Sequence, residues 1–185
     1  LAKVHTLHLT ECSLLRSLTG PRGATAVASA IAVMASLTEC KLCNNNLGVK
    51  GWTIIFSALR DSPTSKITTW DLYNERLGPE IAKPLAEYLS VTSALTSVNI
   101  LSNTLDVESA DALLKVKAEK PNLRTLCGLT HEEVELDLSY CELRPGDAKL
   151  LAPEISVMSA MTECKLRGNK LGVEGWAIVF NTMRD

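Results

Sequence analysis

Hydrophobic residues along this chain follow two alternating periods. Around Cys40 and Leu42, apolar positions alternate with polar ones, which indicates a strand with one buried face. Further along each copy the spacing becomes helical, as where Ile81, Leu85 and Leu89 fall four residues apart with charged residues between them. The pattern therefore predicts units of strand, turn and helix.

The strand half of this pattern can be written L-x-x-[L/C/V/W]-x-L-x-x-[N/C/E]-x-L, and it occurs six times. The copies start 33, 30, 28, 38 and 28 residues apart. Their key positions are Val4, Leu7, Leu9, Cys12 and Leu14; Leu37, Cys40, Leu42, Asn45 and Leu47; Ile67, Trp70, Leu72, Glu75 and Leu77; Leu95, Val98, Ile100, Asn103 and Leu105; Glu133, Leu136, Leu138, Cys141 and Leu143; and Met161, Cys164, Leu166, Asn169 and Leu171.

A longer repeat contains the short one. The stretch Leu37–Asp61 returns as Met161–Asp185 with 15 of 25 residues identical, at an offset of 124 residues. A fixed internal period is typical of stacked copies of one supersecondary unit. The duplicated block holds about four units and one irregular insertion.

One such unit cannot bury both its strand face and its helix face, so neighbouring units must stack. We predict an α/β solenoid that forms a horseshoe segment, with parallel strands on its concave face and helices on its convex face. The whole chain, 1–185, is then a single domain of about six repeats. Because the hydrophobic pattern runs off both ends, we expect a fragment of a longer array, or an array whose ends other chains cover.

Two segments break the pattern. Between Cys12 and Ala24 the first copy carries extra residues relative to the stretch after Cys141, which predicts a longer loop. The stretch Pro121–Leu129 resembles the start of a repeat, but Leu136 follows too soon for a helical crossover to a parallel strand. We predict an irregular insertion near 121–132, or a short strand without its helix.

The repeat pattern, together with the L-G-x-x-G that follows its fifth position, resembles the ribonuclease-inhibitor-like subclass of leucine-rich repeats. That resemblance covers nearly the whole chain. It implies repeats of about 28 residues with a full helix in each. It also implies that an inward amide after each strand binds the turning backbone of adjacent coils.

The amide position is filled in three different ways. Asparagine occupies it three times, and cysteine, a weaker substitute, occupies it twice. The exception is Glu75, which needs a partner because an unpaired buried charge is costly. The residues at this position are Cys12, Asn45, Glu75, Asn103, Cys141 and Asn169.

Composition narrows the functional classes. The 185 residues are 46% hydrophobic and 4% aromatic, which suits a continuous Leu/Ala-rich core. The net charge of −2 provides no general attraction to nucleic acid or to an anionic membrane. No run approaches the 18 apolar residues of a transmembrane helix, and the first residues follow the repeat pattern rather than that of a signal peptide.

The six cysteines indicate the compartment. Cys40 and Cys164 fall at inward strand positions, so we interpret them as buried, reduced thiols. This favours a reducing, intracellular environment, most simply the cytoplasm. Cys40 and Cys43 spell C-x-x-C, but strand alternation places them on opposite faces, which argues against a redox pair or half a zinc site.

We find no pattern that predicts catalysis. The stretch from His131 to Glu135 begins like the H-E-x-x-H zinc motif, but Glu135 stands where the second histidine belongs. We interpret it as a solvated acidic patch in front of a strand. No nucleophile has a base at a suitable spacing, so we expect a protein without catalytic residues, metal or cofactor.

What remains is the row of outward strand positions on the concave face. The row mixes both charges with apolar and aromatic side chains, and it includes Tyr73, Tyr140, Arg167 and an apolar Leu101, residue types that anchor protein interfaces. The insertion at 129–135 is the next candidate. The predicted partner-binding residues are Lys41, Cys43, Asp71, Tyr73, Asn99, Leu101, Asp137, Ser139, Tyr140, Lys165 and Arg167.

The leading hypothesis is a non-catalytic module that binds a protein partner through this curved surface, as the resemblance implies. A structural subunit of a large assembly is the alternative, and it would use its edges and helices as much as its concave face. A further resemblance, to the repeat domain of Ran GTPase-activating proteins, implies a catalytic arginine or asparagine on a loop. Arg76 and Arg144 lie in such loops, without a diagnostic sequence around them.

Overall fold

The computed structural model describes residues 11–13, 20–34, 36–42, 45–62, 65–182 and 184. Within these residues, six short strands alternate with six α-helices. The elements follow in the order β1 (Glu11–Ser13), α1 (Gly20–Ile31), β2 (Glu39–Lys41), α2 (Gly48–Arg60), β3 (Thr69–Asp71), the 3-10 helix η1 (Pro79–Ile81), α3 (Ala82–Val91), β4 (Ser97–Asn99), α4 (Val107–Ala118), β5 (Glu135–Asp137), α5 (Pro145–Ile155), β6 (Glu163–Lys165) and α6 (Gly172–Thr182).

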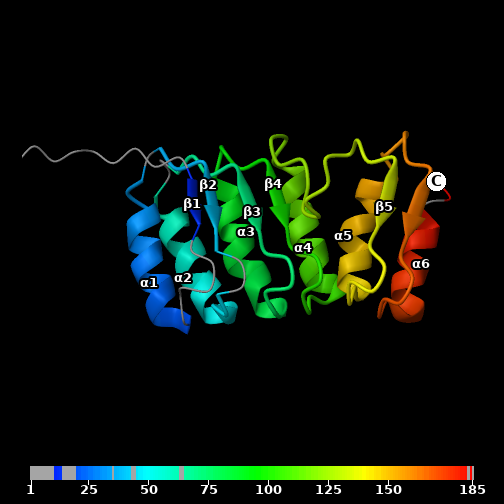
Figure 1. Cartoon of the computed structure of the whole chain (residues 1–185), viewed down its shortest axis with the longest axis horizontal. Coiled ribbons are helices and arrows are strands. Elements are labelled where there is room, and N and C mark those ends of the chain that lie inside the picture. Colours follow the sequence, from blue (N-terminus) through cyan, green and yellow to red (C-terminus); the bar gives the residue numbers. More distant parts are fainter. Residues whose placement is uncertain are drawn as a thin grey trace, which may run out of the picture.

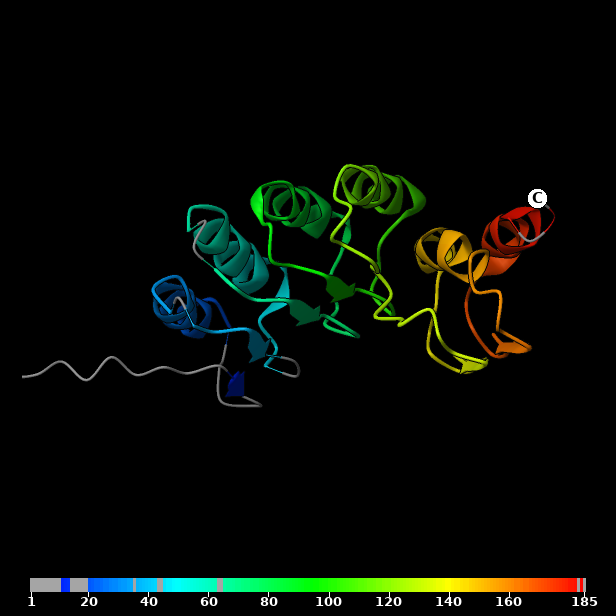
Figure 2. The same cartoon turned by 90° about the horizontal axis from the view of Figure 1, so that it is seen from above.

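All the strand pairs are parallel and lie in chain order. β1, β2, β3 and β4 form one sheet, and β5 pairs with β6 in a second. The helices form a row along one side of the strands (Figure 1). Viewed from above, they make the outer side of an arch whose inner side is lined by the strands (Figure 2). The predicted mixed α/β arrangement, with strands inside and helices outside, is confirmed in these described parts.

The helices form where apolar residues recur on one face. In α2, the buried residues Trp52, Ile55, Phe56 and Leu59 lie three or four positions apart, so they share the side that faces the strands. The predicted face of the third unit is also buried, and it spans η1 and α3. Pro84 is tolerated in the first turn of α3, where a missing amide hydrogen removes no helical bond.

The largest side chains of the core form an aromatic cluster between the second and third units. The Trp52 ring stacks on Phe56 with centroids 5.6 Å apart, and Trp70 meets Trp52 edge-on at 5.7 Å. Tyr88 stacks on the other side of Phe56 at 5.6 Å, and its hydroxyl oxygen lies 3.3 Å from the Trp70 indole nitrogen, which donates to it. These four side chains connect α2 to β3 and α3.

The amide position behaves as the resemblance implies. The Asn103 amide donates to the carbonyls of Leu72 and Ile100, both at 2.8 Å, and its oxygen accepts from Leu77 N at 2.9 Å. Asn169 makes the corresponding bonds in the last unit. Each amide thus connects the turn of its own unit to that of the preceding unit, which satisfies backbone groups that the turns leave free.

The two non-amide residues described at this position, Glu75 and Cys141, form different contacts. Glu75 is buried, and the Trp52 indole donates to its carboxylate over 3.3 Å, so the predicted need for a partner is confirmed. The Cys141 thiol donates weakly to Ser139 O over 3.5 Å.

The predicted register of the first copy is wrong. Cys12 pairs with Cys40 in the parallel β1–β2 ladder, so it occupies the strand position and not the amide position. Gly20 then follows β1 by the same seven residues by which Gly48 follows β2, and both glycines have positive φ as α1 and α2 begin. The longer loop predicted after Cys12 is therefore also wrong, because the extra residues came from the misplaced register.

The stretch near 121–132, where the sequence breaks the repeat pattern, departs from the alternation of strand and helix. Residues 119–134 contain no helix. Instead, the chain runs beside β4, where Val98 N donates to Thr125 O and Ile100 N to Leu126 O, each over 3.0 Å. We call residues 121–130 the bridging segment, because it covers the far edge of β4 and then leads to β5 in the second sheet.

Candidate functional site

The structure divides the predicted concave row. Asp71, Asp137, Tyr140, Lys165 and Arg167 are exposed, while Tyr73, Asn99 and Ser139 are half-buried. Lys41 lies in β2 but its side chain is outside the described structure, and Cys43 lies outside it altogether. The row is therefore not a uniform surface, and its open part lies mainly on β5, β6 and the turns after them.

The expectation of an exposed Leu101 is wrong. Only 2% of this residue is exposed, and it belongs to the hydrophobic core. Strand alternation no longer applies here, because β4 ends at Asn99 and the chain turns, with Ser102 at a φ of 62°. The bridging segment also lies along this side of β4, where the backbone of Gly128 approaches the Asn99 side chain closely.

Tyr73 is held within the protein and does not project as an anchor. Its interaction with the Cys141 side chain raises its pKa, and partial burial adds to that rise. Ser102 lies against the same hydroxyl, and its own side chain donates to Cys141 O. Tyr73 thus links the third unit to the fifth across the break between the sheets.

Five of the predicted residues come together in one place. The concave face of β5 and β6 forms a shallow depression, which we call the β5–β6 surface. It is lined by Asp137, Ser139, Tyr140, Cys164, Lys165, Leu166 and Arg167. All but Cys164 and Leu166 belong to the predicted row, and the structure brings them together here.

A tyrosine and an arginine dominate the β5–β6 surface. The Arg167 guanidinium carbon lies 5.8 Å from the centre of the Tyr140 ring, in a cation–π contact. Tyr140 remains 64% exposed, so the pair offers a flat aromatic face and a set of charged donors to solvent. Gly168 makes this possible, because a Cβ at that position would stand 2.4 Å from the Tyr140 ring.

The backbone at Tyr140 is unusual for its residue type. The third residue after β3, β4, β5 and β6 has a left-handed φ in every case: 55° at Asn74, 62° at Ser102, 58° at Tyr140 and 73° at Gly168. Glycine and asparagine adopt this conformation readily, whereas a bulky aromatic residue does so at a cost. The conformation of the turn therefore does not explain why a tyrosine stands here. What the tyrosine adds is an exposed aromatic ring.

Charges of both signs surround this pair. Lys165 lies 3.0 Å from Glu163, and hydrogen bonding to that carboxylate raises the pKa of the lysine. Asp137 accepts from Ser139 N at 2.9 Å, and this backbone bond lowers the pKa of the aspartate. Both shifts favour the charged forms of Lys165 and Asp137. The β5–β6 surface thus suits a partner of mixed charge better than a polyanion.

Sequence reasoning missed a buried polar cluster beneath the bridging segment. Glu154, on the inner face of α5, is 1% exposed. One carboxylate oxygen accepts from Lys117 Nζ at 2.9 Å and from Leu126 N at 2.8 Å. The other accepts from the Thr125 hydroxyl at 2.6 Å and lies 3.2 Å from His131 Nε2. The available signal was a pair of acidic residues seven positions apart, Asp147 and Glu154, which share one helix face with apolar residues.

This cluster changes the interpretation of His131. Its side chain reaches Glu154 instead of joining the neighbouring acidic residues, of which Glu132 and Glu135 are exposed as predicted. Burial and the nearby Glu154 carboxylate raise the pKa of the Cys127 thiol well above its usual range, so this cysteine stays protonated and unreactive. The cluster holds the bridging segment in place.

A second buried carboxylate, Asp147, joins the fourth and fifth units. It accepts from Ser102 N and from Arg144 N, each over 2.8 Å, but its burial outweighs both bonds and raises its pKa to about 6. The ordinary value is 3.8, so the folded protein binds more protons than the unfolded chain between these values. Asp147 therefore contributes stability at low pH, and this contribution is lost as the pH rises through about 6.

We expect the Asp147 contribution to amount to about 3 kcal/mol between pH 4 and pH 7. Carboxyl-carbon NMR would measure the titration, and urea unfolding of the wild type and Asp147→Asn at both pH values would isolate the contribution. Asp137 serves as an internal control, since its pKa is lowered. Titration of Asp147 below pH 4 would contradict the assignment.

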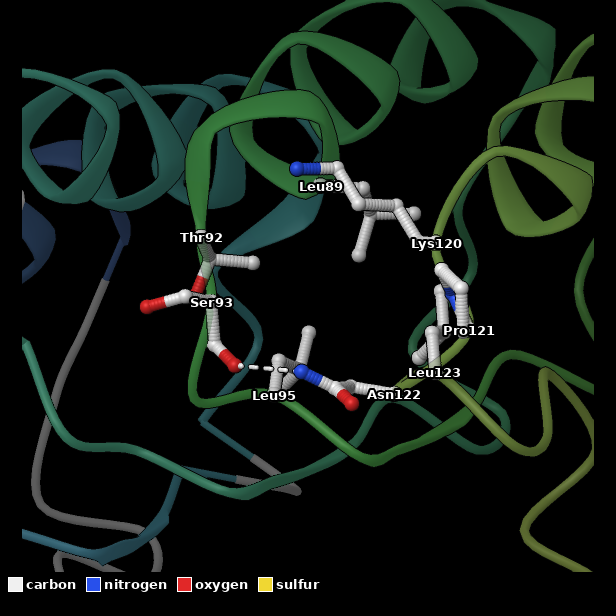
Figure 3. Close-up of a pocket in the computed structure, with 8 residues that line it drawn as sticks. All are labelled: Leu89, Thr92, Ser93, Leu95, Lys120, Pro121, Asn122 and Leu123. Carbon is white, nitrogen blue, oxygen red and sulfur yellow. Dashed lines mark hydrogen bonds between the residues drawn. The ribbon is translucent and has the colours of Figure 1, made fainter.

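A small apolar hollow lies between the C-terminal end of α3 and the start of the bridging segment (Figure 3). Leu89, Leu95, Pro121 and Leu123 contribute to its lining, and the Asn122 amide donates to Ser93 O over 3.4 Å across its mouth. Its volume is about 120 Å³. Ligand pockets usually measure about 300 Å³ or more, so this hollow is a packing gap.

The two loop arginines, Arg76 and Arg144, are both exposed and line separate depressions. Among the described residues, no group of three or more His, Cys, Asp or Glu side chains is arranged to hold a metal ion. Nor is any helix in the described ranges both long and apolar enough to cross a membrane. The β5–β6 surface remains the strongest candidate site.

No model of a known protein family matches the chain. Among solved structures, the chain is similar to one described as Leiomodin-1 Actin-Binding Site 2 (ABS2). The two are 13% identical, with a TM-score of 0.45, and the match covers 95% of this chain and 79% of the other.

Proposed function

We propose that this chain is a leucine-rich-repeat solenoid of the ribonuclease-inhibitor-like kind, a single domain that binds a protein partner without catalysis. The β5–β6 surface is its principal contact. Support comes from one observation above all: an exposed tyrosine in a left-handed turn, stacked with an arginine. Tyrosine and arginine are enriched among the residues that contribute most to protein binding.

The chemistry of this surface defines the partner. A flat aromatic face suits an apolar or aromatic side chain, and Arg167 suits a carboxylate beside it. Glu163 and Lys165 offer further polar contacts at the rim. We propose a protein segment that carries an exposed apolar residue next to an acidic one. The buried thiols of Cys40 and Cys127 fit a reducing, intracellular location.

Changing Tyr140 is expected to separate binding from stability. Tyr140→Asn removes the ring but suits the left-handed turn, so it should raise the free energy of unfolding by about 1 kcal/mol. The same change should weaken partner binding by about 2 kcal/mol, or roughly 30-fold. Chemical denaturation would measure stability, and quantitative affinity capture from native extract would compare the bound proteins.

The matched control for capture is Lys83→Ala with Lys115→Ala, which alters exposed lysines on the helical side. A partner of the β5–β6 surface should be retained by this control and lost from both Tyr140→Asn and Arg167→Ala. Proteins lost from the helical control but kept by the two site variants would contradict the proposal and place binding on the convex side.

The alternative, a structural subunit of a larger assembly, is favoured by a different observation. Helix α6 exposes large apolar side chains that its counterpart in the duplicated block buries. Exposed apolar side chains of this kind suit a permanent contact more than a transient one. Both functions are compatible in one chain, because the two surfaces are formed by different elements.

A further inference from the structure

A threonine directly before most strands joins each unit to the one that precedes it. Thr68 N and its hydroxyl both donate to Thr38 O, and Thr96 makes the same two bonds to Thr68 O, at 2.9–3.2 Å. Thr162 N and its hydroxyl likewise donate to Val134 O. These paired bonds mark the junctions between β2 and β3, between β3 and β4, and between β5 and β6.

The series is interrupted at β5. Val134 stands where the threonine belongs, and it is 52% exposed. The ladder of the fourth unit continues into the bridging segment instead, where Arg124 N donates to Thr96 O over 2.8 Å. Among the described strands, β5 pairs only with β6, and the two lie apart from the row of β1 to β4 (Figure 2). β5 therefore has a free edge inside the chain, with a repeat unit on each side of it.

The backbone of β5 directs two residues toward this free edge. In a parallel strand, successive residues turn their N–H and C=O groups to opposite sides. Leu138 N donates to Lys165 O over 2.8 Å, so the even-numbered residues face β6. Glu135 and Asp137 therefore direct their backbone groups the other way, where no described backbone group bonds to them.

Burial along the strands agrees with an open edge. Leu136 is 8% exposed, whereas Trp70 and Val98, the inward residues at the same position of β3 and β4, are 0% exposed. Both outward residues of β5 are exposed, while those of β4 are half-buried. Solvent thus reaches β5 on the side where β4 is covered by the bridging segment.

The free edge is acidic. Residues 131–137 carry four carboxylates, and the bridging segment carries one arginine, Arg124. Oppositely charged side chains stabilise neighbouring strands, whereas like charges directly opposite each other destabilise them. A second copy of β5 would bring the same acidic side chains, so the edge is unsuited to self-pairing. A basic extended segment is the complementary occupant.

We propose that the free edge of β5 binds an extended segment of the partner protein as an added strand. The backbone groups of Glu135 and Asp137 pair with this segment, its basic side chains lie opposite the two carboxylates, and an apolar side chain covers Val134. The inference rests on the proposed function, because Tyr140 and Arg167 follow β5 and β6 directly and hold one end of the same segment.

The probe is a synthetic octapeptide in which lysine alternates with valine, and NMR hydrogen exchange on the isotope-labelled full chain reports where it binds. We expect the peptide to slow exchange of the Glu135 and Asp137 amides by about 10-fold or more. The Leu138 amide, already bonded to β6, should not change. The same peptide with glutamate in place of lysine should give no protection. No binding of the lysine peptide, or binding that leaves both amides unprotected, would overturn the proposal.

Substitutions at position 137 separate the backbone contribution from that of the side chain. Asp137→Ala keeps the amide hydrogen, whereas Asp137→Pro removes it at a position where the protein loses no backbone bond. The proline variant should bind the lysine peptide about five-fold more weakly than the alanine variant, the effect of roughly one hydrogen bond. Equal affinities would show that no strand is added at this edge.

The same variants distinguish this inference from the proposed function. A native partner that Tyr140→Asn and Arg167→Ala lose but Asp137→Pro retains would leave the β5–β6 surface as the contact and overturn strand addition. A partner that all three variants retain would overturn both proposals.

Discussion

Replacing Glu154 with alanine is expected to lower the free energy of unfolding by about 3–5 kcal/mol, the usual cost of removing one member of a buried ion pair. The carboxylate receives hydrogen bonds from Lys117 Nζ, Leu126 N and the Thr125 hydroxyl. Without it, a mostly buried ammonium group and a buried backbone amide hydrogen lose their acceptor together. No neighbouring acidic group is bonded to both.

The effect should be concentrated in the bridging segment. The Thr125 hydroxyl oxygen accepts from Cys127 N and Leu129 N, so its orientation sets the turn that follows. Glu154 fixes that orientation by accepting the hydroxyl hydrogen. Amide exchange in 121–130 should therefore accelerate more than exchange in α5 itself, because the helix retains its backbone bonds.

Urea unfolding would measure the loss, and Glu132→Ala provides the matched control. Glu132 is exposed and carries the same charge, so its removal should change stability by less than about 0.5 kcal/mol. Glu154→Gln should lose an intermediate amount of stability. Its amide oxygen still accepts a hydrogen bond, but its amide nitrogen is a donor and faces groups that are donors themselves. A loss below about 1 kcal/mol for Glu154→Ala would show that the cluster is not a structural support.

The sequence predicted the local features of this fold well, because those features depend on short periods. The alternation around Trp70 and the helical spacing of Leu85 and Leu89 locate a strand and a helix without any long-range information. The Asn103 bonds follow from the resemblance for the same reason, since each repeat needs an acceptor and a donor at its turn.

The errors arose where two local patterns compete or where distant segments meet. Leu7 and Leu9 fit the strand pattern as well as Cys12 and Leu14 do, but the T-E-C-x-L shared with Thr38–Leu42 identifies the correct register. Strand alternation predicts that Leu101 is exposed. Leu101 is nevertheless buried, because the chain turns after β4 and the bridging segment runs alongside.

The candidate site was predictable in part. Outward positions on and just after β5 and β6 follow from alternation, and the structure brings Asp137, Lys165 and Arg167 to one surface. That Tyr140 stacks with Arg167 depends on which units are neighbours and on the space that Gly168 leaves. Glu154 was missed because its partners are 23 to 37 residues away in the sequence.

The duplicated block allows one substitution to be compared in two environments. Trp52→Ala is expected to cost about 3–5 kcal/mol, the range for removing a large buried aromatic side chain. It would leave a cavity between Phe56 and Trp70 and remove the indole donor from Glu75. Trp176→Ala should cost about 1 kcal/mol or less. The Trp176 ring of the wild type stacks on Phe180 but is partly in water, so its removal takes away less buried contact.

Urea unfolding of both variants would give the difference directly, with Phe56→Ala and Phe180→Ala as a second matched pair. Helix propensity and neighbouring sequence are nearly the same at the two sites, so the difference isolates the contribution of Trp70 and Tyr88, which cover the stack of Trp52 on Phe56. Equal costs at positions 52 and 176 would contradict the assigned role of Trp70 and Tyr88.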